Sequence, residues 1–133
     1  YLAILKVEGL KSGLYRYLPL EHKLLFINSI DNLDKKLSSA TFNQRFVAKS
    51  AVTFIWTAIP YRTEWRYDIA APKLIALDAG HMCENLYLSA ESISSGVCAI
   101  AAYDQDKIDE LLNIDGENEF TVYLASVGKI EKV

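Results

Sequence analysis

The chain has 133 residues, about half of them apolar, and a formal net charge of −3. This length is enough for one domain with its own hydrophobic core. The negative charge and the lack of a Lys/Arg cluster with interleaved aromatics argue against nucleic-acid binding. No signal peptide or transmembrane segment is visible, so we expect a cytoplasmic protein without a membrane partner. Cys83 and Cys98 lie inside apolar runs, which indicates reduced, buried thiols.

The first half of the chain consists mainly of apolar runs separated by turn residues, which predicts strands. Helical spacing of Leu33, Leu37 and Ala40 then predicts a helix, with Asp31 placed as its N-cap. The continuous β-rich run AVTFIWTAI is typical of a strand that is buried on both faces. The predicted elements are strands at 1–7, 14–19, 23–27 and 51–59, and helices at 31–42 and 43–50.

The second half alternates helices and strands. A short helix or turn at 60–67 precedes a long helix, for which Pro72 suits the first turn and Gly96 the left-handed position past the end. A buried strand at 97–103 follows, then a helix capped by Asp104 and a final strand at 120–127. This order predicts an α+β or α/β domain with a mostly antiparallel sheet and helices packed on it.

The long helix has an unusual surface pattern. Its polar side chains form one narrow stripe beside a wide apolar face, and little of its surface is charged. A helix of this kind is usually wedged between other elements, so we expect a second subunit or a planar ligand beside it. The apolar face is Ile75, Ala79, Met82, Cys83, Leu86, Ala90 and Ile93, and the stripe is Asp78, His81, Asn85, Ser89 and Ser92.

Histidine chemistry on this helix is weakly supported. His81 lies in a semi-buried context with Asp78 one turn away, but no nucleophile accompanies them, so a packed structural histidine is the favoured interpretation. Cys83 and Glu84 do not converge with His81 on one point of a helix, so no metal site is predicted. The other histidine, His22, falls in a predicted hairpin.

Two further segments leave alternatives open. The sequence EWRY, residues 64–67, fits a substrate-facing patch and an amphipathic surface turn equally well. Lys129 could meet a phosphate, although its spacing alone favours a solvated basic tail. No glycine-rich phosphate loop is present, so a nucleotide cofactor would have to be held in another way.

Five segments, in order, resemble the FMN-dependent nitroreductase superfamily and specifically its SagB-type dehydrogenase branch. This resemblance implies an α+β nitroreductase-like fold and an oxidoreductase that works as an intertwined homodimer, with FMN at the subunit interface. The branch includes dehydrogenases that oxidise azoline rings in modified peptides. The five segments are VEGLKSGLYRY (7–17), EWRY (64–67), LDAGHMCENLYLSAE (77–91), GVCAIAAYD (96–104) and DGENEFTVYLASVGK (115–129).

The resemblance also implies roles for particular residues. Backbone groups of Ala99, Ile100 and Ala101 would lie near the N5/O4 edge of the flavin, where an N–H donor favours the reduced form. Lys129 would reach the FMN phosphate. Arg66 and Tyr67 would face the substrate. No catalytic side chain is implied.

The chain also departs from the family pattern. The family's N-terminal phosphate-binding segment is not in this sequence, so we expect residues 1–133 to form a nitroreductase-like domain without that segment. Azole-forming members carry a Lys-Tyr pair where this chain has Arg66-Tyr67, which weakens azoline oxidation as a function because arginine holds its proton too firmly to act as a base.

The function that the sequence favours is hydride transfer from NAD(P)H or another donor to an organic acceptor. The alternatives are a non-catalytic dimeric binding or assembly module and a peptide azoline dehydrogenase. The sequence does not identify the acceptor or distinguish NADH from NADPH.

Overall fold

The computed structural model describes residues 1–130 and contains one six-stranded sheet of order β3-β2-β1-β4-β6-β5. Every neighbouring pair in the sheet runs antiparallel. The predicted antiparallel α+β architecture is therefore confirmed. The strands are β1 (Leu2–Ile4), β2 (Gly13–Leu18), β3 (Lys23–Asn28), β4 (Val52–Ala58), β5 (Ser95–Ile100) and β6 (Phe120–Lys129).

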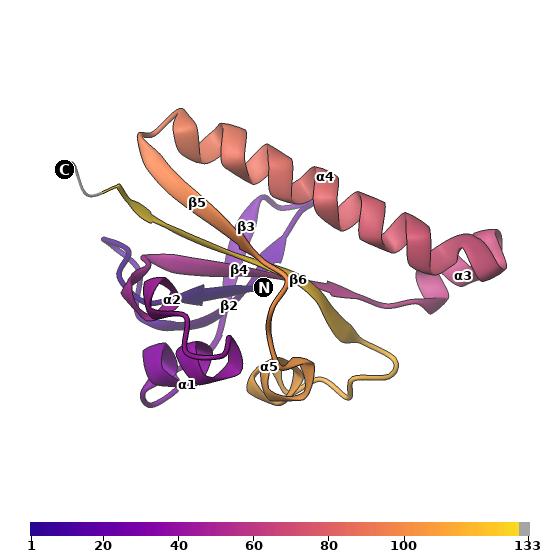
Figure 1. Ribbon diagram of the computed structural model, residues 1–133, viewed down its shortest axis with the longest axis horizontal. Coiled ribbons are helices and arrows are strands. Elements are labelled where there is room, and N and C mark those ends of the chain that lie inside the picture. Colours follow the sequence, from indigo (N-terminus) through magenta and orange to yellow (C-terminus); the bar gives the residue numbers. More distant parts are fainter. Residues whose placement is uncertain (131–133) are drawn as a thin grey trace.

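Helices cover the two faces of the sheet unequally (Figure 1). Three helices lie against one face, which we call the closed face, and the long helix α4 lies alone across the other, which we call the open face. No helix within residues 1–130 is long and apolar enough to cross a membrane. The helices are α1 (Leu33–Ala40), α2 (Arg45–Lys49), α3 (Tyr61–Tyr67), α4 (Ala71–Glu91) and α5 (Gln105–Leu112), with a 3-10 turn, η1 (Asp68–Ala70), before α4.

The main hydrophobic core lies on the closed face. Leu37 of α1 and Ile108 of α5 pack in one cluster with Ile55 and Leu124 from the central strands β4 and β6, and all four are essentially inaccessible to solvent. Asp109 joins α5 to β6, because its Oδ1 accepts hydrogen bonds from the backbone N–H and the hydroxyl of Thr121 at 2.8 and 2.6 Å. The closed face therefore forms a fully packed hydrophobic core.

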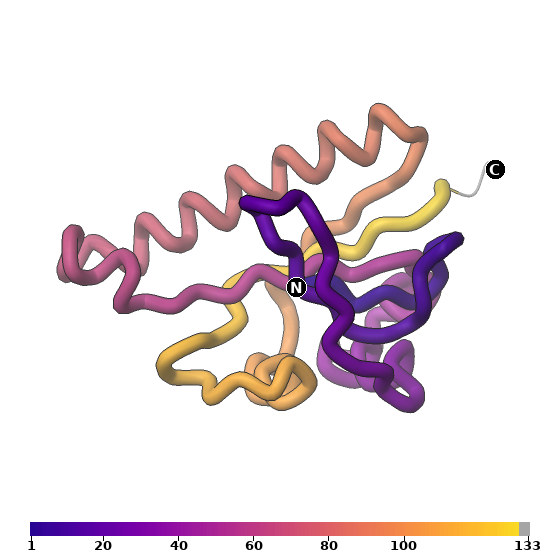
Figure 2. The backbone as a smooth tube through the Cα atoms, turned by 180° about the vertical axis from the view of Figure 1, so that it is seen from behind, coloured from indigo at the N-terminus to yellow at the C-terminus, as the bar shows by residue number. Residues whose placement is uncertain are grey.

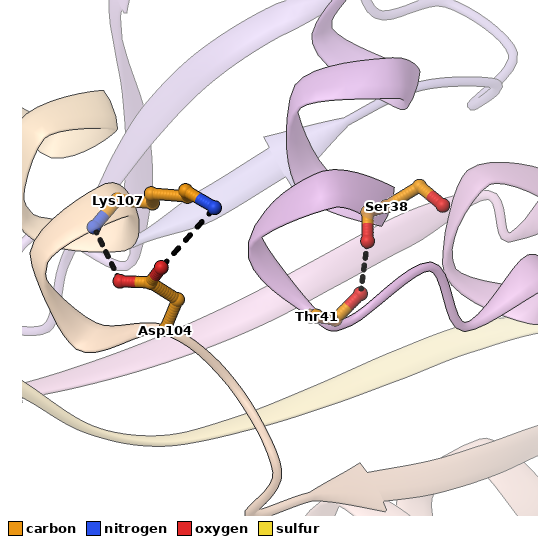
Figure 3. A network of polar contacts seen from close by, with 4 residues as sticks. All are labelled: Ser38, Thr41, Asp104 and Lys107. Carbon is orange, nitrogen blue, oxygen red and sulfur yellow. Dashed lines mark hydrogen bonds and ion pairs between the residues drawn. The ribbon is translucent and has the colours of Figure 1, made fainter.

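Helix ends on the closed face are stabilised by local polar contacts (Figure 3). The Asp104 carboxylate accepts the Lys107 backbone N–H at 3.3 Å and pairs with the Lys107 ammonium at 3.2 Å, so the predicted N-cap is confirmed. These hydrogen bonds and the Lys107 charge hold the pKa of Asp104 below its usual range. At the end of α1, the Thr41 hydroxyl donates to the carbonyls of Leu37 and Ser38.

Two predicted helix boundaries are wrong. Asn32, in the left-handed conformation, and not Asp31, occupies the N-cap of α1, and its side chain makes no capping bond. At the end of α4 the left-handed residue is Ser94, with φ 54°, because Gly96 already belongs to strand β5 and pairs with Gly128. Pro72 lies in the first turn of α4, as predicted.

The burial predicted for two strands is also wrong. Strand β5 forms the edge of the sheet and only Ile100 is fully buried in it. In β4, Ile55 is buried on the closed face, whereas Phe54 and Trp56 on the open face are only half-buried. The apolar run of β4 therefore has an open side that the sequence alone does not reveal.

Candidate functional site

Helix α4 covers only part of the open face. Ala90 is buried against the sheet and Leu86 is half-buried in the same cluster, with Val97 and Val127 of β5 and β6 beneath them. Ala79 and Cys83 are also buried, and their small side chains allow the helix to approach the sheet closely. The strands on the far side of β4 are left without a covering helix.

A groove of about 1020 Å³ fills this uncovered region. Its floor is formed by β1 and β4, one wall by α4, and the other wall by the β2–β3 hairpin, which rises on the same side of the sheet as α4 (Figure 2). Trp56 and Phe54 stack on the floor with ring centroids 6.3 Å apart and an interplanar angle of 27°. The groove therefore offers a broad, mostly apolar surface with aromatic planes.

Polar groups are few in the groove and lie on its walls. Asp78, Asn85 and Ser89, three members of the predicted polar stripe of α4, line one wall. Arg16 and Arg62 are also among the lining residues, from β2 and α3. A large apolar pocket with a few convergent polar groups is the usual setting for a small-molecule site.

A hydrogen-bonded tyrosine–histidine pair stands on the hairpin wall. The Tyr17 hydroxyl and His22 Nδ1 are 2.8 Å apart, and the two rings meet edge to face at 5.8 Å. Both side chains line the groove. His22 was expected in a hairpin and not at a site, although a histidine five residues after a tyrosine across a tight hairpin was a usable signal.

His81 is not the semi-buried histidine that the sequence suggested. It is exposed on α4, lies outside the groove lining, and makes no side-chain hydrogen bond among the described residues. The helix turns this position toward solvent because Ala79 and Cys83 occupy the buried side. Within residues 1–130, no three His, Cys, Asp or Glu side chains gather as metal ligands.

The backbone of residues 99–101 forms the end of the exposed edge of the sheet. The Ala99 N–H points away from β6 and donates to the Tyr87 hydroxyl at 2.9 Å. Since successive residues of an antiparallel strand alternate direction, the N–H of Ile100 points toward β6, where Ile100 pairs with Leu124. Ala101 lies just beyond the last ladder pair and is exposed. If the same alternation continued past the strand end, its N–H would be the next donor along this edge.

Lys129 lies at the opposite end of the same two-stranded ladder. It is exposed and pairs with Ser95, whereas Ala99 pairs with Ala125. Four residues of strand separate Ala99 from Ser95, which corresponds to about 13 Å. The two predicted cofactor contacts therefore lie at opposite ends of the β5–β6 ladder, residues 99–101 on the edge strand β5 and Lys129 on its neighbour β6.

Arg66 and Tyr67 lie outside the groove. Both are exposed on α3, where the Arg66 guanidinium stacks over the Tyr67 ring at 5.5 Å from its centroid. Arg62 and Thr63 of the same helix line the groove instead. A short helix or turn was expected here, but no pattern in residues 60–67 indicated which side of it would face the groove.

Phenol and thiol groups gather between α4 and the last two strands. Burial raises the pKa of Tyr123, and the neighbouring Cys83, Tyr87 and Cys98 groups add to the rise. Burial, with the Glu84 carboxylate as a second cause, also raises the pKa of the Cys83 thiol. The raised pKa values keep the Tyr123 phenol and the Cys83 thiol protonated and neutral at physiological pH, which suits an apolar helix–sheet contact.

Residues 3–129 match the nitroreductase family, and the chain belongs to that family. Among individual proteins, the chain is 28% identical over 129 residues to a Methanocaldococcus jannaschii protein that carries the name nitroreductase. The match covers 97% of this chain and 63% of that protein. The chain thus spans less than two thirds of the length of this relative.

Solved structures show the same fold. A protein from Anabaena variabilis that also carries the name nitroreductase superposes with a TM-score of 0.88 at 28% identity, over 95% of this chain and 26% of that one. The Escherichia coli microcin synthetase complex McbBCD gives a TM-score of 0.83 at 17% identity, over 98% and 51% of the two chains. At that identity the second likeness concerns the fold alone.

Proposed function

We propose that this protein is an FMN-dependent oxidoreductase of nitroreductase type. It would pass a hydride from NAD(P)H, or another donor, to an organic acceptor. The observation that carries the proposal is the open face of the sheet. This chain belongs to the nitroreductase family, and its open face has a groove with an aromatic floor beside α4 and an exposed strand edge at residues 99–101.

The side chains and backbone groups present suit FMN. The outward N–H of Ala101 is the donor we assign to the N5/O4 edge of the ring, because the Ala99 N–H already binds Tyr87 and the Ile100 N–H faces β6. Lys129 supplies one positive charge for the phosphate from the other end of the ladder. The bound flavin would supply the hydride chemistry, and the protein would position it and tune its electronics.

A homodimer is part of the proposal. Large apolar side chains of α4 and of the turn after it are exposed in a single copy: Leu77, Met82 and Leu88 of the helix and Ile93 of the turn are 50, 53, 64 and 70% exposed. Monomeric soluble proteins seldom leave so much apolar surface on one helix, and a symmetric second copy would cover it. We infer that α4 and the groove form the dimer contact, with the flavin between a strand edge of one copy and the groove of the other.

The direct test is the visible absorption spectrum of the full-length protein, with the bound cofactor identified after heat release. We expect a yellow protein that releases FMN and turns over with NAD(P)H. A colourless preparation that also does not bind added FMN would overturn the proposal. A dimer that binds FMN but shows no turnover with either nicotinamide donor would favour a binding or assembly module.

Two variants test the assigned contacts separately. Ala101→Pro removes the N–H, and the extended backbone of Ile100 suits a residue that precedes proline. We expect a lower flavin reduction potential with little change in affinity. Lys129→Gln should weaken FMN binding with little change in potential. Equal effects of both variants on both quantities would contradict the assignment.

A further inference from the structure

We propose that His22, oriented by Tyr17, is the proton donor to the acceptor that binds in the groove. The inference rests on the proposed function, because it names a further residue for the same site. Tyr17 and His22 line the groove together and lie 2.8 Å apart between Oη and Nδ1. With Nδ1 held by Tyr17, Nε2 is the ring nitrogen left for a ligand.

The local backbone supports a fixed position for this ring. His22 has a φ of 50°, a conformation that residues other than glycine adopt infrequently. It occupies the turn between β2 and β3, and the edge-to-face contact with Tyr17 adds to the hydrogen bond. In a single copy the pair is exposed, and we assign water as the source from which the ring regains its proton after each turnover.

Histidine is the side chain in the groove best suited to proton delivery near neutral pH. The other charged groups that line the groove are Arg16 on β2, Arg62 on α3, Asp78 on α4, Glu119 before β6 and the N-terminal ammonium of Tyr1, which is already bonded to the Ile55 carbonyl at 2.8 Å. Guanidinium groups hold their protons, and ordinary carboxyl groups have already lost theirs at this pH. Glu119 is in addition bound by the Thr57 hydroxyl at 2.6 Å.

The chemistry balances for a quinone acceptor. A quinone that receives a hydride gains two electrons and becomes a hydroquinone anion, while the reduced flavin of the proposed function is oxidised. One proton then completes the neutral hydroquinone. We assign that proton to the Nε2–H of the His22 imidazolium, which becomes neutral imidazole and is reprotonated by water.

Two acceptors separate proton delivery from electron transfer. Duroquinone needs a proton on its oxygen, and its fully substituted ring avoids addition of the exposed Cys98 thiol. Ferricyanide accepts one electron and no proton. In His22→Asn we expect the rate with duroquinone to fall about 100-fold, the lower end of the range for general acid catalysis, and the rate with ferricyanide to stay within about two-fold.

The variants are chosen to preserve the fold. Asparagine tolerates the left-handed backbone of position 22 and keeps a polar group beside Tyr17. His81→Asn is the matched control, since this second histidine is exposed on α4 and outside the groove lining. Tyr17→Phe should reduce the duroquinone rate less than His22→Asn does.

A measurement without turnover uses the flavin-loaded wild-type protein. Under anaerobic conditions, durohydroquinone should shift the ring resonances of His22 and leave those of His81 unchanged. Unshifted His22 resonances, or a His22→Asn variant that reduces duroquinone at the wild-type rate, would overturn this inference alone. A protein that binds no FMN and reduces neither acceptor would overturn the proposed function with it.

Discussion

The two faces of the sheet carry similar apolar residues but bury them to different extents. On the closed face, α1, α2 and α5 bury Leu37, Ile55 and Leu124 completely. On the open face, α4 buries its small residues but leaves Phe54 and Trp56 half-covered beside a groove of about 1020 Å³. Equal hydrophobicity in the sequence therefore does not mean equal burial, and the incompletely covered face is the one available for binding.

The largest expected effect is on the closed face. Leu37→Ala should lower the free energy of unfolding by about 2–5 kcal/mol, because it leaves a cavity in a packed core. Urea denaturation measures this loss. Leu20→Ala, at a site 95% exposed, is the control and should change little. Equal losses for both variants would show that the closed face is not the stabilising core.

The next largest effect concerns the buried hydrogen bonds between Asp109 and Thr121 on the same face. Asp109→Ala should cost about 3 kcal/mol, since it leaves the buried N–H and hydroxyl of Thr121 without their acceptor. Glu110→Ala removes a neighbouring exposed carboxylate of α5 and serves as the control in the same urea titration. A small effect of Asp109→Ala would indicate that water replaces the lost acceptor.

On the open face the effect should fall on assembly instead of folding. Met82→Glu places a charge in the proposed dimer contact and should weaken the dimer by about 2 kcal/mol, or roughly 30-fold in dissociation constant. Sedimentation equilibrium measures the change. Phe42→Glu, in the connection between α1 and α2, should leave the dimer intact. An unchanged constant for Met82→Glu would place the dimer contact elsewhere.

A smaller effect concerns the strand edge beneath α4. Tyr87→Phe removes the acceptor of the Ala99 N–H and should make local opening easier by about 1 kcal/mol, which is about five-fold faster amide exchange. Hydrogen exchange at the Ala99 amide is the measurement. Tyr61→Phe, on the exposed helix α3, should have no effect there. Unchanged exchange in Tyr87→Phe would mean that the edge is protected by other means.

The smallest effect is a pH dependence in the loop before β6. Asp115 accepts the backbone N–H groups of Glu117, Asn118 and Glu119, and its hydrogen bonds, first that from the Asn118 side chain, lower its pKa to about 2. A lowered folded-state pKa stabilises the protein above the unfolded value of about 4, and this contribution is lost as the pH falls from about 4 to 2.

Asp115→Asn should therefore be slightly less stable than the wild type at pH 7. The difference should shrink below pH 4, because the wild-type carboxylate then becomes protonated. Urea midpoints collected across this range measure it. A difference that stays constant down to pH 2 would exclude the charge of Asp115 as its source.

The prediction of secondary structure from sequence succeeded where local chemistry decides. Apolar runs bounded by turn residues located the strands, the Asp104 carboxylate marked the start of α5, and Pro72 marked the first turn of α4. Boundaries failed where the backbone takes a left-handed conformation without glycine, as at Asn32 and Ser94. Several residues can adopt that conformation, so the sequence does not select one.

The candidate site was less predictable. The polar stripe of α4 indicated a special neighbour, and three of its members do line the groove. Tyr17, His22 and Arg62 were missed, because the hairpin and α3 are brought to the groove by contacts between segments far apart in the chain. His81 was judged semi-buried from its helix alone, but the packing of Ala79 and Cys83 turned it outward.

The sequence by itself determined the elements, the antiparallel α+β class and the family resemblance, because these depend on periodicity and on short motifs. Only the tertiary structure decided which face of the sheet is fully covered by helices and which is left partly uncovered. It also decided which backbone N–H of residues 99–101 remains available at the strand edge. The physical reason is that burial and hydrogen-bond partnership depend on which distant segments meet, and a pattern within one segment does not specify its neighbours.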